Sequence, residues 1–388
     1  MINILYDLQL SMVKGERFLT HRDSNVNVAE SILKQLTKRN TDMKFYVLVP
    51  PVQMCSSDQL STTKQVKLID YPYNLNSFVD RMSIDTKSLQ LINVSIDLVY
   101  TNDPCKVLSY KNFFYYKQNK MVPVISRNHW VTGKIDRKVP TDIDFMIRQV
   151  EGAIYGDWMT FNSHYAVQVF LDGAKEFYND ATISNIQHKL SVIEMVNVSK
   201  IDKYKTSERF SIFTILWAHR LSYYTGWKET FKQLLKLWDR RKDFQVIVPD
   251  PGDKFSQQYL KDLYPFVGII DKSTWDYESY IKTCWKSDIC LGNHSYPATW
   301  GGLAITEPMA AYTVPIMPYR HGYMEMFYPL FPPFFKTNDE MIQCIEMYMD
   351  DASLLDQHKK LARDFCEKDL SMDNFIGTVE DKVRLLCM

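Results

Sequence analysis

Short apolar runs alternate with amphipathic segments along the first half of the chain. The runs are long enough only for buried strands, and polar or turn-forming residues follow them. Between them, segments such as 26–38 and 143–156 place their apolar residues on one helical face. We expect strands at residues 2–7, 44–49, 66–69, 97–100, 122–126 and 158–161. Strands that alternate with helices predict a parallel α/β sheet.

The second half repeats this pattern after a connection at residues 170–199. Strands are expected at 211–217, 244–248, 266–270, 288–291 and 314–317, and helices at 227–238, 277–285, 339–349, 353–367 and 374–386. The polar stretch 199–207 suits a domain boundary. The sequence therefore predicts an α/β protein with two Rossmann-like domains, 1–200 and 201–388.

Composition narrows the classes of function. The 388 residues include 46 basic and 46 acidic side chains, so the net charge is zero. This argues against a wholly cationic nucleic-acid binder but leaves room for a local basic groove. No apolar run has the length of a membrane span, and no secretory signal is visible. The seven cysteines are scattered, so we expect reduced thiols in a cytoplasmic protein.

One segment, residues 111–138, is both basic and aromatic. It holds seven basic residues against the single acid Asp136, with Phe, Tyr and Trp side chains interleaved. Such a surface suits phosphate contacts and base stacking, and the alternative is a solvated helix face with core aromatics. The expected contacts to nucleic acid are Arg127, Trp130, Lys134, Arg137 and Lys138.

The stretch 287–317 reads as strand, glycine-bearing turn, helix and strand. Gly301 and Gly302 open the helix, and Glu307 follows in it. Glycines at a helix start let backbone N–H groups approach an anion, while Glu307 can reach sugar hydroxyls of the same ligand. The alternative is an ordinary strand–helix turn whose glycines only relieve crowding.

A second strand–helix junction carries two cations, Arg220 and Lys228. Two cations with helix N-termini can neutralise a diphosphate without a metal ion, so we expect no metal and no cofactor besides a nucleotide co-substrate. The pattern Asp142-Ile143-Asp144 occurs in metal-dependent transferases. Here it opens a helix after Pro140, where acids are favoured anyway. No Ser-His-Asp or Cys-His arrangement is evident.

These motifs resemble those of one enzyme family. Residues 217–220 with Trp227-Lys228 resemble the arginine-and-lysine diphosphate motif of retaining GT-B glycosyltransferases. Residues 302–311 resemble the G-L-x-x-x-E-A-M-A-A helix of that family, and 313–316 resemble the strand after it. The resemblance covers about residues 210–320, whereas the first half matches only as an α/β architecture.

The resemblance implies two domains that face each other across a cleft, with a terminal helix that crosses back to the first domain. The first domain would bind the acceptor and the second a nucleotide sugar, with UDP as the usual nucleotide. Retaining transfer in this family needs no protein nucleophile, because the leaving diphosphate takes the acceptor's proton.

The resemblance also assigns roles to residues. Arg220 and Lys228 would hold the diphosphate and Glu307 the ribose hydroxyls. The remaining assignments are backbone N–H groups of Gly301, Gly302 and Leu303 for the diphosphate, and His129 near the transferred sugar. Thr299 stands where the family usually has a first glutamate, and His294 is the candidate to compensate.

The acceptor is inferred from a weaker resemblance. Residues 223–228 resemble a bacteriophage DNA α-glucosyltransferase, and the strand end at 217–220 resembles the queuosine-tRNA mannosyltransferases. The leading expectation is transfer to a hydroxymethylated pyrimidine in phage DNA, in the cytoplasm of the host cell. The alternatives are a polysaccharide, glycolipid or tRNA acceptor, and a protein that binds nucleotide sugars without turnover.

Overall fold

The structure is a computed structural model with two compact units. It describes residues 1–8, 24–50, 60, 63–73, 83–128, 131, 140–219, 221, 225–249, 254–270, 276–292, 302–327 and 334–388. Unit 1 comprises Met1–Glu194 and Asp373–Met388, and unit 2 comprises Met195–Met372. The assignment of acceptor and donor to separate domains, and the cleft between them, stay predictions.

Unit 1 is built on a seven-stranded sheet in the order β3-β2-β1-β4-β5-β6-β7. Every pair of neighbours is parallel. The strands are β1 (Ile2–Asp7), β2 (Met43–Val49), β3 (Val66–Asp70), β4 (Leu98–Thr101), β5 (Val124–Arg127), β6 (Trp158–Phe161) and β7 (Leu190–Val192). The central strands β4, β5 and β6 are buried throughout, as expected where helices cover both faces of a parallel sheet.

The helices of unit 1 connect successive strands and cover the sheet. They are α1 (Ser24–Arg39), α3 (Thr86–Gln90), the 3₁₀ helix η3 (Pro104–Lys106), α4 (Val107–Gln118), α5 (Pro140–Tyr155), α6 (His164–Ala174) and α7 (Asp180–Gln187). Residues 170–199 were expected to be a connection, but they contain α7 and β7. The three residues of β7 are only half-buried and include a serine, so this edge strand has no apolar run to reveal it.

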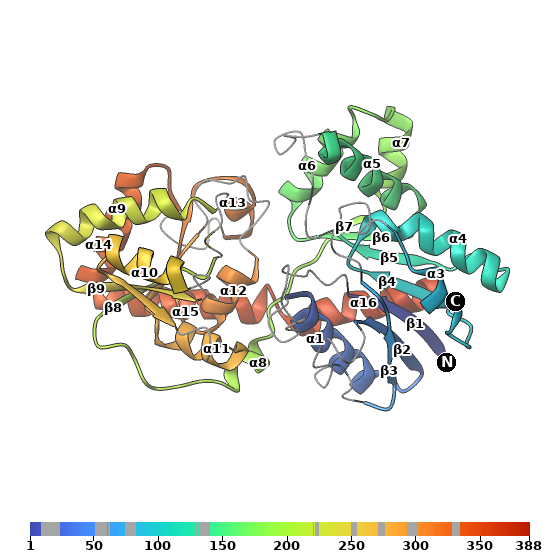
Figure 1. Cartoon of the computed structure of the whole chain (residues 1–388), viewed down its shortest axis with the longest axis horizontal. Helices are drawn as coiled ribbons and strands as arrows, with labels where there is room; N and C mark the ends of the chain where they lie inside the picture. Colours follow the sequence, from blue (N-terminus) through green and yellow to red (C-terminus); the bar gives the residue numbers. More distant parts are fainter. Residues whose placement is uncertain are drawn as a thin grey trace. The chain divides into compact units, whose positions relative to one another are not determined.

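The terminal helix α16 (Met372–Cys387) belongs to unit 1 apart from its first residue, which confirms the predicted return of the chain. In Figure 1 this red helix lies among the blue and green elements of the first unit. Its apolar side is buried at Ile376, Val379 and Val383. The Arg384 guanidinium lies 3.1 Å from the Asp42 carboxylate, just before β2.

Unit 2 has a six-stranded sheet in the order β10-β9-β8-β11-β12-β13, again with parallel neighbours. The strands are β8 (Phe213–Leu216), β9 (Phe244–Pro249), β10 (Val267–Ile270), β11 (Ile289–Leu291), β12 (Val314–Pro318) and β13 (Phe334–Phe335). The helices are α8 (Val198–Asp202), α9 (Trp227–Arg240), α10 (Lys254–Leu263), α11 (Tyr277–Lys286), α12 (Leu303–Ala310), α13 (His321–Phe327), α14 (Asn338–Asp350) and α15 (Ala352–Lys368). Two parallel sheets confirm the predicted fold class.

Two buried cations fix α15 to the rest of unit 2. The Lys359 ammonium lies 2.8 Å from the carboxylate of Asp288, which itself accepts a hydrogen bond from the Thr214 backbone at the start of β8. The Arg363 guanidinium binds the Asp202 carboxylate at 2.7 Å and donates to the Ala310 carbonyl at 2.5 Å. One side chain therefore joins α8, α12 and α15.

Among the described residues, no helix combines the length and the apolar character needed to cross a membrane.

The variant Arg363→Met should lower the free energy of unfolding by about 2–3 kcal/mol, because it leaves the Ala310 carbonyl without this donor and Asp202 without its cation. Denaturant unfolding measures the change. The control Lys282→Ala removes only an exposed pair with Glu278 within α11 and should unfold at the denaturant midpoint of the parent. Equal losses from both variants would contradict the role given to Arg363.

Candidate functional site

The strand order of unit 2 reverses between β8 and β11, which are hydrogen-bonded neighbours. In open α/β sheets, ligands bind beyond the carboxyl ends of the strands at such a reversal. Helix α9 follows β8 along the chain and α12 follows β11. The two predicted strand–helix junctions therefore begin at the carboxyl ends of adjacent strands. The fold thus places the predicted diphosphate and ribose motifs at one edge of one sheet.

The start of α12 requires glycine. Gly302 precedes the helix with φ 59° and ψ −170°, a backbone conformation that residues with a Cβ rarely adopt. Its carbonyl accepts the first backbone hydrogen bonds of the helix, from Ile305 and Thr306. The glycine is therefore demanded by the turn itself, and the turn directs the N–H groups of residues such as Leu303 along the helix start.

Glu307 is the central acid of this site and is 8% exposed. Its Oε1 accepts a hydrogen bond of 2.9 Å from the Tyr277 hydroxyl of α11. Burial raises the pKa of Glu307 to about 7, although Tyr277, the charge of Lys200 and Tyr280 each act to lower it. Lys200 also stands 4.5 Å from the centre of the Tyr277 ring. Near neutral pH this carboxyl is balanced between its protonated and ionised forms.

Sequence reasoning missed Tyr277, although a signal existed. Tyr277, Tyr280 and Cys284 follow at helical spacing and so lie on one face of α11. Burial raises the pKa of the Tyr277 hydroxyl well above its ordinary value, so it remains a hydrogen-bond donor. The spacing of these residues on α11 could be recognised in the sequence. The contact of Tyr277 with the Glu307 carboxyl of α12 could not.

His219, at the end of the Trp217–Arg220 motif, joins the two strands at the reversal. Its ring hydrogen-bonds the Leu291 backbone at the end of β11, and burial lowers its pKa to about 4. The imidazole is therefore neutral at pH 7. Its buried Nε2 has no hydrogen-bond partner within the described parts of the chain. A neutral ring in this position can contact a ligand without adding positive charge.

Lys228 stands exposed in the first turn of α9, after Gly226, which adopts φ 69°. Its ammonium lies 5.6 Å from the centre of the neighbouring Trp227 ring. Lys228 also lines a hollow of about 300 Å³ together with Leu263 and Tyr264 of the α10 region. Lys228 is thus an accessible cation on the helix that follows the carboxyl end of β8. In the described part of the structure, it makes no contact with Glu307.

The remaining predicted site residues divide into two groups. Arg127 lies at the end of β5, where it is buried and forms an ion pair of 3.4 Å with Glu194. Its proposed contact with nucleic acid stays a prediction. Outside the described residues lie His129, Trp130, Lys134, Arg137, Lys138, Arg220, His294, Thr299 and Gly301.

Unit 1 has a charged cluster at its own strand reversal, between β1 and β4, which the sequence did not reveal. The Asp7 carboxylate ends β1 and is fully buried. It accepts hydrogen bonds from the Lys106 ammonium at 3.0 Å, the Tyr110 hydroxyl at 2.7 Å and the Tyr73 hydroxyl at 2.8 Å. Burial alone would raise the pKa of Asp7, but Lys106 and the two tyrosines hold it below its ordinary value. This acid is ionised and fully engaged, which suits a structural role.

Solved glycosyltransferase structures match the chain over nearly its whole length. A glycosyltransferase from Rickettsia africae is 15% identical with a TM-score of 0.71, and the match covers 99% of this chain and 98% of that one. HepE from Anabaena, in complex with UDP-glucose, is 13% identical with a TM-score of 0.70 and coverage of 99% and 100%. Sucrose-phosphate synthase from Thermosynechococcus elongatus is 12% identical with a TM-score of 0.74 and coverage of 100% and 99%.

No family model matches the chain, and a search of curated proteins finds no match. Structural likeness at this level of identity establishes the fold. The two parallel sheets and the returning terminal helix therefore form the GT-B fold, as the sequence motifs predicted.

Removal of the Tyr277 hydroxyl tests the electrostatics of Glu307. The hydrogen bond from Tyr277 favours the ionised form of Glu307, so Tyr277→Phe, which lacks this bond, should raise the pKa of Glu307 above about 7. NMR titration of the carboxyl carbon measures this, with Tyr259→Phe on α10 as the control. An unchanged pKa would show that Tyr277 does not hold the acid.

The same shift predicts a pH effect on stability. Between the ordinary pKa of 4.5 and about 7, the folded protein keeps a proton on Glu307 that the unfolded chain loses. Stability from this group is therefore lost as pH rises through that window, by up to about 3 kcal/mol. In the variant Glu307→Gln, the free energy of unfolding should lack this decrease between pH 4.5 and about 7.

Proposed function

We propose that the protein is a glycosyltransferase that uses a UDP-sugar donor. The observation that carries this proposal is the edge of unit 2, where Gly302 at positive φ opens α12 and the buried Glu307 follows in it. Support comes from solved structures with the same fold, among them HepE, which was solved both with UDP-glucose and with UDP. Nucleotide sugars are the ligands for which such a strand edge and helix start are suited.

In this proposal each residue has a defined task. Arg220, Lys228 and the backbone N–H groups at 301–303 hold the diphosphate, and Glu307 accepts hydrogen bonds from the ribose hydroxyls. His219 stays neutral, so the two cations carry the electrostatic stabilisation of the leaving group. His129, His294 and Thr299 are assigned to the side of the transferred sugar.

We further propose that transfer proceeds with retention. The bond between the anomeric carbon and the diphosphate oxygen breaks, and a bond from that carbon to the acceptor oxygen forms on the same face. The acceptor's proton moves to the leaving diphosphate oxygen. No protein nucleophile and no metal ion enters the scheme, because the diphosphate acts as the base and Arg220 and Lys228 balance its charge.

Lys228→Ala should weaken UDP binding by roughly 10- to 100-fold, because a charge-assisted hydrogen bond to phosphate is lost. Isothermal titration calorimetry measures the change. Lys236→Ala is the matched control, since Lys236 is exposed on the same helix further from its start. If both variants bind UDP like the parent, α9 does not contribute to the donor site.

For the acceptor, we propose a hydroxymethylated pyrimidine in DNA, with Arg127, Trp130, Lys134, Arg137 and Lys138 as contacts. The support is the resemblance at residues 223–228 and the basic, aromatic segment 111–138. The target base would be flipped out of the duplex to reach the reacting sugar.

One observation favours a second candidate, a glycan acceptor. Several cations of segment 111–138 are already paired within unit 1. The Lys111 ammonium lies 2.7 Å from the Asp157 carboxylate, and that of Lys120 lies 3.2 Å from Asp97. With Arg127 bound to Glu194, these side chains offer less charge to a phosphate backbone than the sequence suggests.

One reaction separates the candidates. The protein is mixed with hydroxymethylated DNA and a panel of UDP-sugars, and the digested nucleosides are weighed by mass spectrometry. A nucleoside heavier by one sugar is expected for the DNA acceptor, and replacing Lys134, Arg137 and Lys138 with Ala should reduce that product and its salt dependence. Unmodified DNA, with UDP-sugar binding intact, would reject this acceptor. Absence of transfer to glycan and tRNA acceptors as well would indicate a non-catalytic binder.

A further inference from the structure

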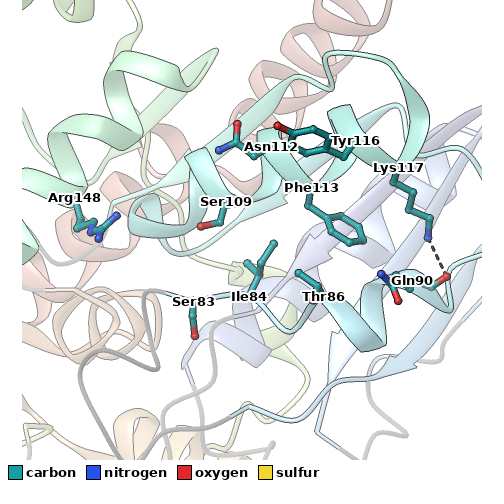
Figure 2. A pocket seen from close by; sticks show the side chains of 10 residues that line it. All are labelled: Ser83, Ile84, Thr86, Gln90, Ser109, Asn112, Phe113, Tyr116, Lys117 and Arg148. Carbon is teal, nitrogen blue, oxygen red and sulfur yellow. Dashed lines mark hydrogen bonds between the residues drawn. The ribbon is translucent and has the colours of Figure 1, made fainter.

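A groove of about 830 Å³ opens on unit 1 between the α3 region and α4. Figure 2 shows the side chains that line it. On α4 the lining residues Ser109, Asn112, Phe113 and Tyr116 follow the i, i+3, i+4, i+7 spacing, which places them on one helical face. The groove therefore arises from the periodicity of α4.

The floor and rim of the groove differ in burial. Phe113 and Ile84 form an apolar floor, because both pack against the buried cluster beneath the sheet. Figure 2 shows the Phe113 ring directed from α4 toward the opposite wall. At the rim, Tyr116 is 86% exposed, so its ring is accessible to a ligand.

Five polar side chains on the two walls are neutral. Ser83, Thr86 and Gln90 contribute hydroxyl and amide groups from the α3 side, opposite Ser109 and Asn112 of α4. Each of these side chains can both donate and accept hydrogen bonds. Among the described residues that line the groove, none is acidic.

The two cations in the lining are already engaged. The Lys117 ammonium donates to the carbonyls of Leu89, Gln90 and Ile92 at 2.7, 3.1 and 2.8 Å, so it caps the end of α3. Partial burial lowers the pKa of Lys117. Arg148 lies 3.6 Å from the Glu151 carboxylate and is half-exposed. One accessible cation is few for a phosphodiester backbone, which carries a charge at every nucleotide.

We propose that this groove binds a neutral oligosaccharide. Flat aromatic side chains cover the apolar C–H faces of sugar rings, and amide and hydroxyl groups satisfy the equatorial hydroxyls around them. The volume of the groove falls in the range of small-molecule binding sites. It is large enough for several sugar rings and far larger than a single small ion needs. The saccharide is the non-reacting part of a glycan acceptor, and this last assignment rests on the second candidate of the proposed function.

Binding is tested without any donor, on the full chain. Maltohexaose, cellohexaose and chitohexaose are titrated by NMR and calorimetry, and at least one is expected to bind with shifts at Asn112, Phe113 and Tyr116. Tyr116→Ala should weaken that binding by about tenfold or more, whereas Tyr116→Phe keeps the ring and should bind like the parent. Because Tyr116 is exposed, the variant should melt at the parent temperature.

The control Tyr155→Ala removes another exposed tyrosine, on α5, and should leave saccharide binding unchanged. Lack of binding by all three saccharides, or binding that ignores Tyr116, overturns the proposal. Tyr116-dependent binding of a DNA oligonucleotide in their place also overturns it. UDP affinity, measured in parallel, separates these outcomes from a failure of the proposed donor site, since loss of UDP binding leaves the saccharide result intact.

Discussion

Parallel strand pairing is the constraint on which both units depend. In each described sheet the carboxyl ends of all strands meet at one edge, so residues distant in sequence are collected there. In unit 1 this edge gathers Asp7, Lys106 and the tyrosines around them. In unit 2 it gathers the His219 strand end and the glycine that opens α12. How the helices pack around each edge then determines which of these groups remain accessible to solvent.

The pKa values of the buried acids at the two sheet edges are shifted in opposite directions. Asp7 has a cation and two phenolic donors, so its charge is compensated and its pKa is held low. For Glu307 the tyrosine hydroxyls and the charge of Lys200 lower the pKa less than burial raises it, so its pKa rises to about 7. An acid whose ionised form is incompletely compensated has interaction capacity left for a ligand, whereas a fully compensated acid stabilises the fold. This contrast explains why the acid of unit 2, and not that of unit 1, fits a binding site.

Much of the fold was predictable because buried parallel strands leave apolar runs, and the helices between them leave amphipathic patterns. The strand β7 escaped because it is short, half-buried and polar at its centre. Gly302 and Glu307 were readable from local spacing, since turn and helix lie within a few residues. The Tyr277–Glu307 contact and the capping of α3 by Lys117 join residues far apart in sequence, and no local pattern specifies such pairs. Charge counting therefore could not show that Lys111 and Lys120 of segment 111–138 pair with carboxylates of unit 1.

The return of α16 to unit 1 has a consequence for biosynthesis. Residues 373–388 emerge from the ribosome after the whole of unit 2, yet they belong to the unit that was made first, and their apolar side is buried there. The nascent first sheet must therefore wait with part of its apolar face uncovered, while unit 2, whose chain is continuous, can fold at once. Chaperone demand during translation should thus fall on the amino-terminal sheet, and a chain truncated just after unit 2 would expose that face permanently.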